Sequence, residues 1–213
     1  MPTRPPARMP EKMSPDRALL DQLLDDKTVL AHVAFVDDDG NPAALPTLVA
    51  RLDDSILVHG STGSRWMRRI ASGVDVAVSV AVVDGVVVAR SAFESSLVYT
   101  SAVLFGSFTP VAEAEREPAL NAMTERLIPG RVDEVRPSTK RELAATMILQ
   151  MPIRQWSLRT SDNWPEDPAD DVTGPAWAGQ LRFGAPSVDV YPAPDLRDGI
   201  EPPPSISQVR GVR

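Results

Sequence analysis

The sequence contains no cysteine and only two histidines, and both shortages limit the chemistry that the protein can perform. Without cysteine there is no disulfide framework, no thiolate nucleophile and no thiolate metal site. The histidines, His32 and His59, lie 27 positions apart and lack the short spacing of metal-binding motifs, so we expect no metal site. The absence of cysteine is compatible with a reducing cytoplasm, which is the location that we predict.

Basic residues are also few, because 22 Lys and Arg stand against 29 Asp and Glu and give a formal net charge of -7. Nucleic acids and anionic membranes both require a basic protein face, so we expect neither as a partner. The apolar residues 74–93 are interrupted by Asp75, Asp84 and Arg90, and the uninterrupted part is too short for a membrane span. No apolar run follows the basic N-terminal residues, so no secretory signal is expected.

Apolar runs separated by turn residues predict a mainly β protein. The apolar run that begins at residue 74 is interpreted as two buried strands joined by a hairpin at Asp84-Gly85, because glycine accepts the positive φ of such turns. Further strands are expected at residues 28–36, 43–52, 55–60, 99–111 and 148–159. Because hairpins make most of the connections, the pattern favours a small antiparallel barrel with helical appendages.

Helices are expected at both ends of this barrel sequence and once inside it. Ser14 at the N-cap and Pro15 in the first turn predict a helix that ends near Lys27. Thr139 and Glu142 have the spacing of a capping box. The other predicted helices cover residues 65–72, 113–128 and 138–148.

The two ends of the chain differ in composition from the middle. Residues 161–213 hold 9 of the 21 prolines, so they are interpreted as an arm rather than as regular structure. Trp164, Trp177 and Phe183 favour partial docking of this arm. We therefore predict a flexible segment at residues 1–13, a folded domain at residues 14–160 and a partly docked, proline-rich arm at residues 161–213.

The stretch "HGSTGSR" at residues 59–65 joins a predicted strand to a predicted helix. Backbone N–H groups, hydroxyl groups and the helix start meet there, which is the chemistry of a phosphate site. Arg65 supports this reading, because a cation in the first turn of a helix opposes the macrodipole unless an anion lies there. The alternative is a polar turn in which Ser64 caps the helix and the arginines coat a solvated face.

The ordered motifs HGS, SR, DG, ARSAF, Y-x-S and FG lie between residues 59 and 106 and provide a more specific signal. The likeness that they support extends over about residues 16–180. Together they resemble the flavin-nucleotide-binding branch of the pyridoxamine 5'-phosphate-oxidase-like family, and especially the Nim-type nitroimidazole-resistance reductases. The resemblance implies a split β-barrel, a mainly antiparallel fold that forms a homodimer. It also implies FMN in two equivalent clefts at the dimer interface.

The resemblance implies a set of cofactor-binding residues: Pro46, Thr47, Leu48, His59, Gly60, Ser61, Ser64, Arg65 and Arg159. The turn at residues 60–65 would hold the flavin phosphate through Ser61, Ser64 and Arg65. Backbone groups of residues 46–48 would bond the edge of the flavin ring. His59 would point toward the cleft, and Arg159 stands where relatives often have lysine.

The chain departs from the family at the loop after ARSAF, where many relatives continue with His-His-Ser and this chain has Glu94-Ser95-Ser96. His59 and Glu94 are the candidate catalytic residues, and the alternative for Glu94 is an exposed loop carboxylate. The implied function is an FMN-dependent oxidoreductase that carries electrons from a reduced nicotinamide to a small electrophile. A deazaflavin-dependent reductase and a non-catalytic flavin- or haem-binding protein remain as alternatives.

Overall fold

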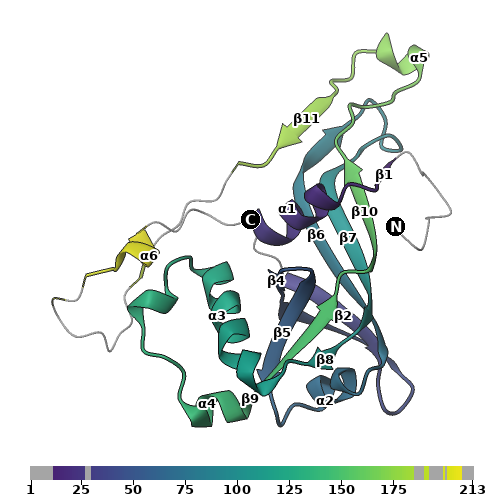
Figure 1. Ribbon diagram of the computed structural model, residues 1–213. Helices are drawn as coiled ribbons and strands as arrows, with labels where there is room; N and C mark the ends of the chain where they lie inside the picture. The colour runs from purple at the N-terminus through teal and green to yellow at the C-terminus, as the bar shows by residue number, and fades with distance from the viewer. Residues whose placement is uncertain (1–11, 27–29, 185–189, 192–198, 200, 208–213) are drawn as a thin grey trace.

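The computed structural model describes residues 12–26, 30–184, 190–191, 199 and 201–207, and its centre consists of two antiparallel sheets (Figure 1). The larger sheet has the strand order β1 (Met13–Ser14), β10 (Gln155–Ser161), β7 (Ser96–Ser107), β6 (Asp75–Val88), β2 (Leu30–Val36) and β3 (Pro42–Leu48). An additional strand, β11 (Gly179–Arg182), pairs with β6. The smaller sheet has the order β4 (Ala50–Leu52), β5 (Ser55–Ser61), β9 (Thr146–Pro152) and β8 (Thr109–Pro110).

The two sheets share one hydrophobic core, because the chain passes repeatedly from one sheet to the other. Leu104 of β7 and Val58 of β5 are both fully buried in this core. The chain changes sheets between β3 and β4, between β5 and β6, between β7 and β8, and between β9 and β10. This arrangement is a split β-barrel, so the predicted fold class is confirmed.

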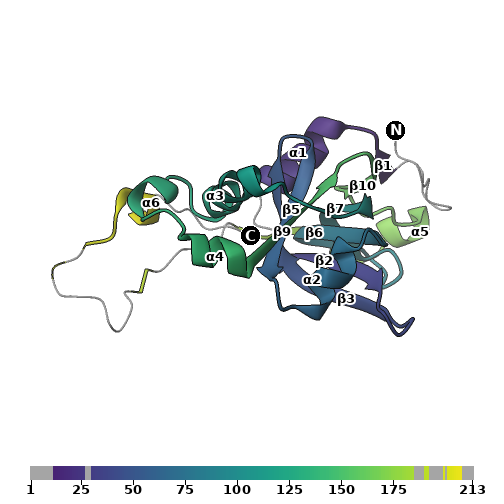
Figure 2. The same ribbon diagram turned by 60° about the horizontal axis from the view of Figure 1, so that its bottom comes forward.

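Several helices pack against the barrel, and Figures 1 and 2 show α3 (Arg116–Leu127) and α4 (Lys140–Ala145) beside β5 and β9. Ala119 and Met123 of α3 pack against Leu57 of β5 and Ile148 of β9 in a second, smaller core. The helices are α1 (Arg17–Asp26), α2 (Arg65–Ala71), α3 (Arg116–Leu127), α4 (Lys140–Ala145), α5 (Ala169–Val172) and α6 (Pro204–Ser207), with 3-10 turns η2 (Glu113–Glu115) and η3 (Val132–Glu134). Among the described residues, no helix has the length and apolar character needed to cross a membrane.

The ends of two helices differ in detail from the sequence prediction. Asp16, and not Ser14, caps α1, because its carboxylate accepts the N–H groups of Ala18 at 2.9 Å and Leu19 at 3.3 Å. The capping box predicted for α4 is present. This helix ends at Ala145, earlier than predicted, because the following residues pair with β5 as strand β9.

The hairpin predicted at Asp84-Gly85 is wrong. β6 continues through this pair as a single strand of 14 residues, with a bulge between Val83 and Gly85. A Cβ on Gly85 would lie 2.3 Å from the carbonyl oxygen of Leu181 in β11. The glycine is thus required by the close approach of a distant strand and not by a turn.

The strand predicted at residues 148–159 is two strands that belong to different sheets. The chain bends after Pro152, and buried Ile153 anchors the bend through its N–H, which donates to the carbonyl of Asp54 at 2.8 Å. β10 then joins the larger sheet between β1 and β7.

Part of the C-terminal arm lies along the barrel, where β11 extends the larger sheet beside the upper end of β6 (Figure 1). The three aromatic side chains expected to dock remain exposed, with exposed fractions of 70% for Trp164, 64% for Trp177 and 47% for Phe183. The division into a segment, a domain and an arm stays a prediction. Most of residues 1–13 and most residues after 184 lie outside the described part of the chain.

Candidate functional site

The turn between β5 and α2 is held in shape by its own polar groups. The carbonyl of Ser61 accepts the N–H of Ser64 at 3.0 Å, and the Ser61 hydroxyl accepts the N–H of Gly63 at 3.1 Å. The N–H of Thr62 donates to the carbonyl of Ala145 in α4 at 3.0 Å. Ser64 occupies the N-cap position of α2, but its hydroxyl makes no capping hydrogen bond. Helix capping therefore does not explain this serine.

Gly60 is explained by packing. A Cβ at this position would lie 2.8 Å from Cγ of Met67, whose side chain is fully buried under α2. The glycine therefore lets α2 lie directly against the end of β5. This close packing places the start of α2, and with it Arg65, beside the last residues of the strand.

Arg65 is an exposed side chain that already has anionic partners. Its guanidinium donates to the carboxylate of Asp39 at 2.9 Å and lies 3.6 Å from that of Asp38. The hydrogen bond to Asp39 and the charges of both carboxylates raise the pKa of Arg65. Asp38 also lies 3.4 Å from the guanidinium of Arg69. The anion expected at the start of α2 is thus supplied by the turn between β2 and β3.

A cavity of about 440 Å³ brings Arg65 together with strand β3. Its surface is mainly apolar, and two carboxylates and two guanidinium groups also line it. The side chains around it are Phe35, Asp37, Asp38, Ala43, Ala44, Leu45, Arg65, Trp66 and Arg69. Of the predicted cofactor residues, only Arg65 lines this cavity. Trp66 and Arg69 also line the cavity, and the sequence analysis did not predict them as site residues. The sequence signal that could have identified them is their position in the predicted helix that begins at Arg65.

β3 carries the three residues expected along the flavin ring, Pro46, Thr47 and Leu48. They pair with His32, Ala31 and Leu30 of β2, respectively. β3 forms the edge of the larger sheet, so one side of its backbone pairs with no strand in the described part of the chain. Such an edge offers backbone groups to a ligand, which is the role that the resemblance implies for residues 46–48.

His59 is half-buried near the end of β5, directly before Gly60. Side chains alternate along a strand, so His59 shares the face of Leu57, which packs against α3. Its Nδ1 atom is buried and has no hydrogen-bond partner among the residues that the structure describes. Burial lowers the pKa of His59, which favours the neutral imidazole.

Glu94 and Arg159 lie far from this turn within one chain. Glu94 follows the far end of β6, whose 14 residues span roughly 45 Å. Arg159 lies in β10 opposite Met13 and Ser101, and three strands separate β10 from β3. A single chain therefore divides the predicted site into two halves, one at β3 and α2 and the other at β10 and the loop after β6.

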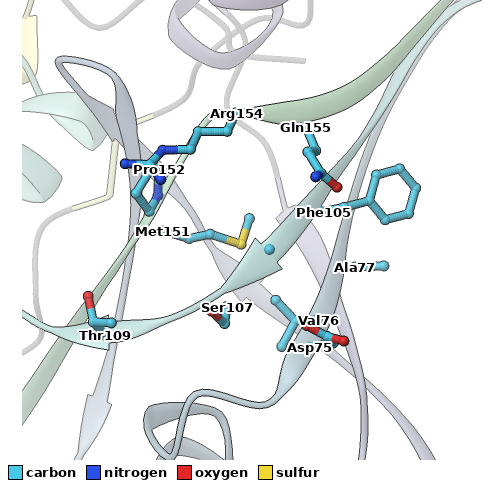
Figure 3. A pocket seen from close by; sticks show the side chains of 11 residues that line it. Asp75, Val76, Ala77, Phe105, Ser107, Thr109, Met151, Pro152, Arg154 and Gln155 are labelled. Carbon is cyan, nitrogen blue, oxygen red and sulfur yellow. The ribbon is translucent and has the colours of Figure 1, made fainter. Parts of the chain in front are cut away.

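A larger cavity of about 630 Å³ lies at the start of β6 and the end of β7, next to the end of β9 and the start of β10. Figure 3 shows Arg154 and Gln155 on one side of it, Asp75 and Ser107 on the other, and Met151 between them. None of the predicted site residues lines this cavity. No group of three or more His, Cys, Asp or Glu side chains that could hold a metal ion occurs within the described ranges.

The strand order and the crossings between two sheets define the class of protein as a split β-barrel, with β3 at the edge of the larger sheet. The family model described as pyridoxamine 5'-phosphate oxidase matches residues 16–160, and the chain belongs to this family. The family expected from the sequence motifs is confirmed. No curated protein matches the chain.

Two solved structures resemble nearly the whole chain. The FAD and haem binding protein from Mycobacterium smegmatis is 45% identical, with a TM-score of 0.90, over 94% of this chain and 98% of that one. The flavocytochrome Anf3 from Azotobacter vinelandii is 28% identical, with a TM-score of 0.89, over 96% of this chain and 95% of that one. A protein assigned to 5-nitroimidazole resistance in Bacteroides thetaiotaomicron, 14% identical over 68% of this chain and 84% of that one with a TM-score of 0.58, shares the fold.

Proposed function

We propose that this protein is a flavin-dependent oxidoreductase that binds a flavin nucleotide between β3 and the turn at residues 61–65. The observation that carries the proposal is the cavity of about 440 Å³ shared by Arg65 and β3. It combines an apolar surface for a ring system with the guanidinium group of Arg65 for a phosphate. The 45% identity with a protein described as binding FAD and haem supports the same ligand class.

FAD is the first candidate for the flavin nucleotide because the relative with 45% identity is described as binding it. FMN, the cofactor expected from the sequence, is the alternative. Both carry a flavin ring, a ribityl chain and a phosphate next to that chain, so the same turn and edge strand suit either. The bound flavin would supply the hydride and electron chemistry.

The protein residues would bind and orient this nucleotide. Arg65 would exchange Asp39 for a ligand phosphate, which offers more acceptor oxygens than one carboxylate. The hydroxyls of Ser61 and Ser64 stand in the same turn and would donate to that phosphate. Transfer of electrons from a reduced nicotinamide to a small electrophile, including a nitroimidazole, is the part of the proposal that needs a direct assay.

We also propose a homodimer in which each flavin site is completed by the partner subunit. The division of the predicted site into two distant halves supports this assembly. The strand register also places five residues in one row across the larger sheet: Pro46, His32, Ser79, Val103 and Ser157. None of these five residues is Asp, Glu, Lys or Arg. Interface centres are depleted in charged residues, so this row suits a surface that a second copy covers.

Haem is the second cofactor that we propose, because both extensively similar proteins are described as haem-binding or as a flavocytochrome. Haem iron is commonly held by histidine. His59 fits that role, since it is half-buried, favours the neutral form and has a buried ring nitrogen without a partner in the described chain. His32, the other histidine, is exposed on the outer face of the larger sheet and does not share these properties. Bound haem would add one-electron redox chemistry.

The visible absorption spectrum of the freshly purified protein tests these proposals, followed by release and chromatographic identification of the pigments. We expect flavin absorption bands and a haem Soret band. Loss of the flavin absorption bands after addition of a reduced nicotinamide, which shows that the flavin is reduced, would support the oxidoreductase activity. A colourless protein that takes up neither FAD, FMN nor haem on reconstitution would overturn the proposed function.

A further inference from the structure

A third cavity, of about 470 Å³, lies at the end of β6 that is farthest from α2. Two segments that are distant in sequence form its walls, the loop with Phe93 and Glu94 and the arm segment with Trp164 and Glu166. It shares no residue with the cavity at Arg65 or with the cavity in Figure 3. Glu94 and β10 also belong to the half of the predicted flavin site that the partner subunit would complete, but that proposal gives Phe93, Trp164 and Glu166 no role.

The aromatic walls of this cavity are exposed to an unusual degree. The exposed fractions are 89% for Phe93 and 70% for Trp164. Large aromatic side chains gain most when their faces are covered, so two of them facing one cavity indicate a ligand surface. Trp164 also comes from the arm, for which the sequence predicts only partial docking.

Both walls are fixed in place by polar contacts. In the first loop, the hydroxyl of Ser95 donates to the carbonyl of Ser91 at 2.9 Å and accepts the N–H of Ala89 at 3.1 Å. In the arm, the carboxylate of Asp167 is 1% exposed and pairs with the guanidinium of Arg90 at 2.9 Å. The exposed aromatic side chains thus stand on ordered segments, which lowers the entropic cost of binding a ligand.

The charges around the cavity are mainly negative. Glu94 and Glu166 contribute two carboxylates, against the single ammonium group of Lys12. Glu166 accepts a hydrogen bond from the side-chain amide of Asn163 at 3.3 Å. The backbone N–H of Glu94 donates to the Ser91 hydroxyl at 3.2 Å, and the Glu94 carboxylate has no hydrogen-bond or ion-pair partner among the described residues.

We propose that this cavity binds a flat organic cation, with its ring against Phe93 and Trp164 and its charge near Glu94 and Glu166. Aromatic faces attract cations through their quadrupole, and tryptophan does so most strongly. The two carboxylates add to this attraction and disfavour anionic ligands. This inference adds a second ligand class beside the proposed flavin site, with which the cavity shares Glu94, and it does not require bound flavin or haem.

The test compares three probes that share one ring and differ in charge: 1-methylnicotinamide as the cation, nicotinamide as the neutral molecule and nicotinate as the anion. Binding to the full-length protein is measured by calorimetry and by ligand-observed NMR. We expect the cation to bind about tenfold more tightly than nicotinamide, and nicotinate to bind least. The variants Trp164→Leu, Phe93→Leu and Glu94→Gln should each remove most of this preference.

Matched controls separate the cavity from general surface effects. Trp177→Leu changes another exposed tryptophan of the same arm that does not line the cavity, and Glu113→Gln removes a distant exposed carboxylate. Both should bind the three probes like the wild type, and thermal melting checks that every variant is folded. Equal affinity for the three probes, absence of binding, or the same loss in Trp177→Leu would each overturn the proposal.

Discussion

At the scale of single residues, Arg65 is the group whose environment a ligand would change most. In the free protein its partners are Asp38 and Asp39, which are 51% and 65% exposed. Ion pairs between exposed side chains contribute little to stability, because water and salt screen them. Exchange of these carboxylates for a phosphate would therefore cost the fold little, while the phosphate gains a charge-assisted hydrogen bond.

We expect Arg65→Ala to weaken flavin-nucleotide binding by roughly 10- to 100-fold, because one charge-assisted hydrogen bond to the phosphate is lost. Thermal stability should change little. Fluorescence titration with FAD and FMN measures the effect, and Arg141→Ala, which removes an exposed arginine of α4, is the control. Riboflavin lacks the phosphate and should bind wild type and variant alike. Equal loss of riboflavin binding would show that Arg65 supports the site without contacting a phosphate.

At the scale of elements, α4 is a short helix that depends on its capping box. Glu142 bonds the N–H of Thr139 at 2.7 Å and accepts a hydrogen bond from Arg136 at 2.6 Å. These contacts, with Arg136 as the largest cause, lower the pKa of Glu142 from 4.5 to about 2. Since the folded-state pKa is depressed, the contribution of Glu142 is complete above pH 4.5 and is lost as the pH falls toward 2.

Glu142→Gln should therefore destabilise α4 at neutral pH and have progressively less effect between pH 4.5 and about 2. Amide hydrogen exchange of residues 140–145, compared between wild type and variant across this range, measures the difference. Glu117→Gln, in α3, is a control without a capping box. A difference between wild type and Glu142→Gln that is unchanged at pH 2 would contradict the assignment.

The bulge in β6 leads to a second prediction at this scale, because Gly85 lies there. Gly85→Ala places a Cβ 2.3 Å from the Leu181 carbonyl, so β11 must shift away from β6. Overpacking of this kind costs about 1–3 kcal/mol. Equilibrium denaturation in urea should show this loss, whereas Gly184→Ala, where a Cβ meets nothing within 4 Å, should be near neutral. Unchanged stability of Gly85→Ala would mean that β11 is held loosely against β6.

These elements also show which features the sequence could predict. Local signals predicted α2, the capping box of α4 and most strands, because caps, turns and apolar periodicity act over a few residues. The hairpin prediction at Asp84-Gly85 was wrong because the glycine is required by β11, a strand about 95 residues later in the sequence. The partners of Arg65 were missed for the same reason, since Asp38 and Asp39 belong to a distant turn. The split of residues 148–159 between two sheets is likewise a tertiary feature.

At the scale of the whole molecule, the separated halves of the candidate site lead to the central claim. Arg65 lines one cavity with residues of β3, the edge strand of the larger sheet, and Arg159 lies in β10, separated from β3 by three strands. In a two-fold symmetric dimer, the first half of one subunit can meet the second half of its partner. The dimer and the flavin site are therefore one proposal.

Complementation between two inactive variants tests this claim most directly. Arg65→Ala and Arg159→Ala each damage both sites of their own homodimer, so each alone should bind flavin nucleotide weakly. When the two are unfolded together and refolded as a mixture, mixed dimers contain one doubly altered site and one intact site. We predict that flavin titration then recovers tight binding at about a quarter of the sites, as random pairing of subunits requires. A mixture that binds no more tightly than the separate variants would contradict a flavin site shared between two chains.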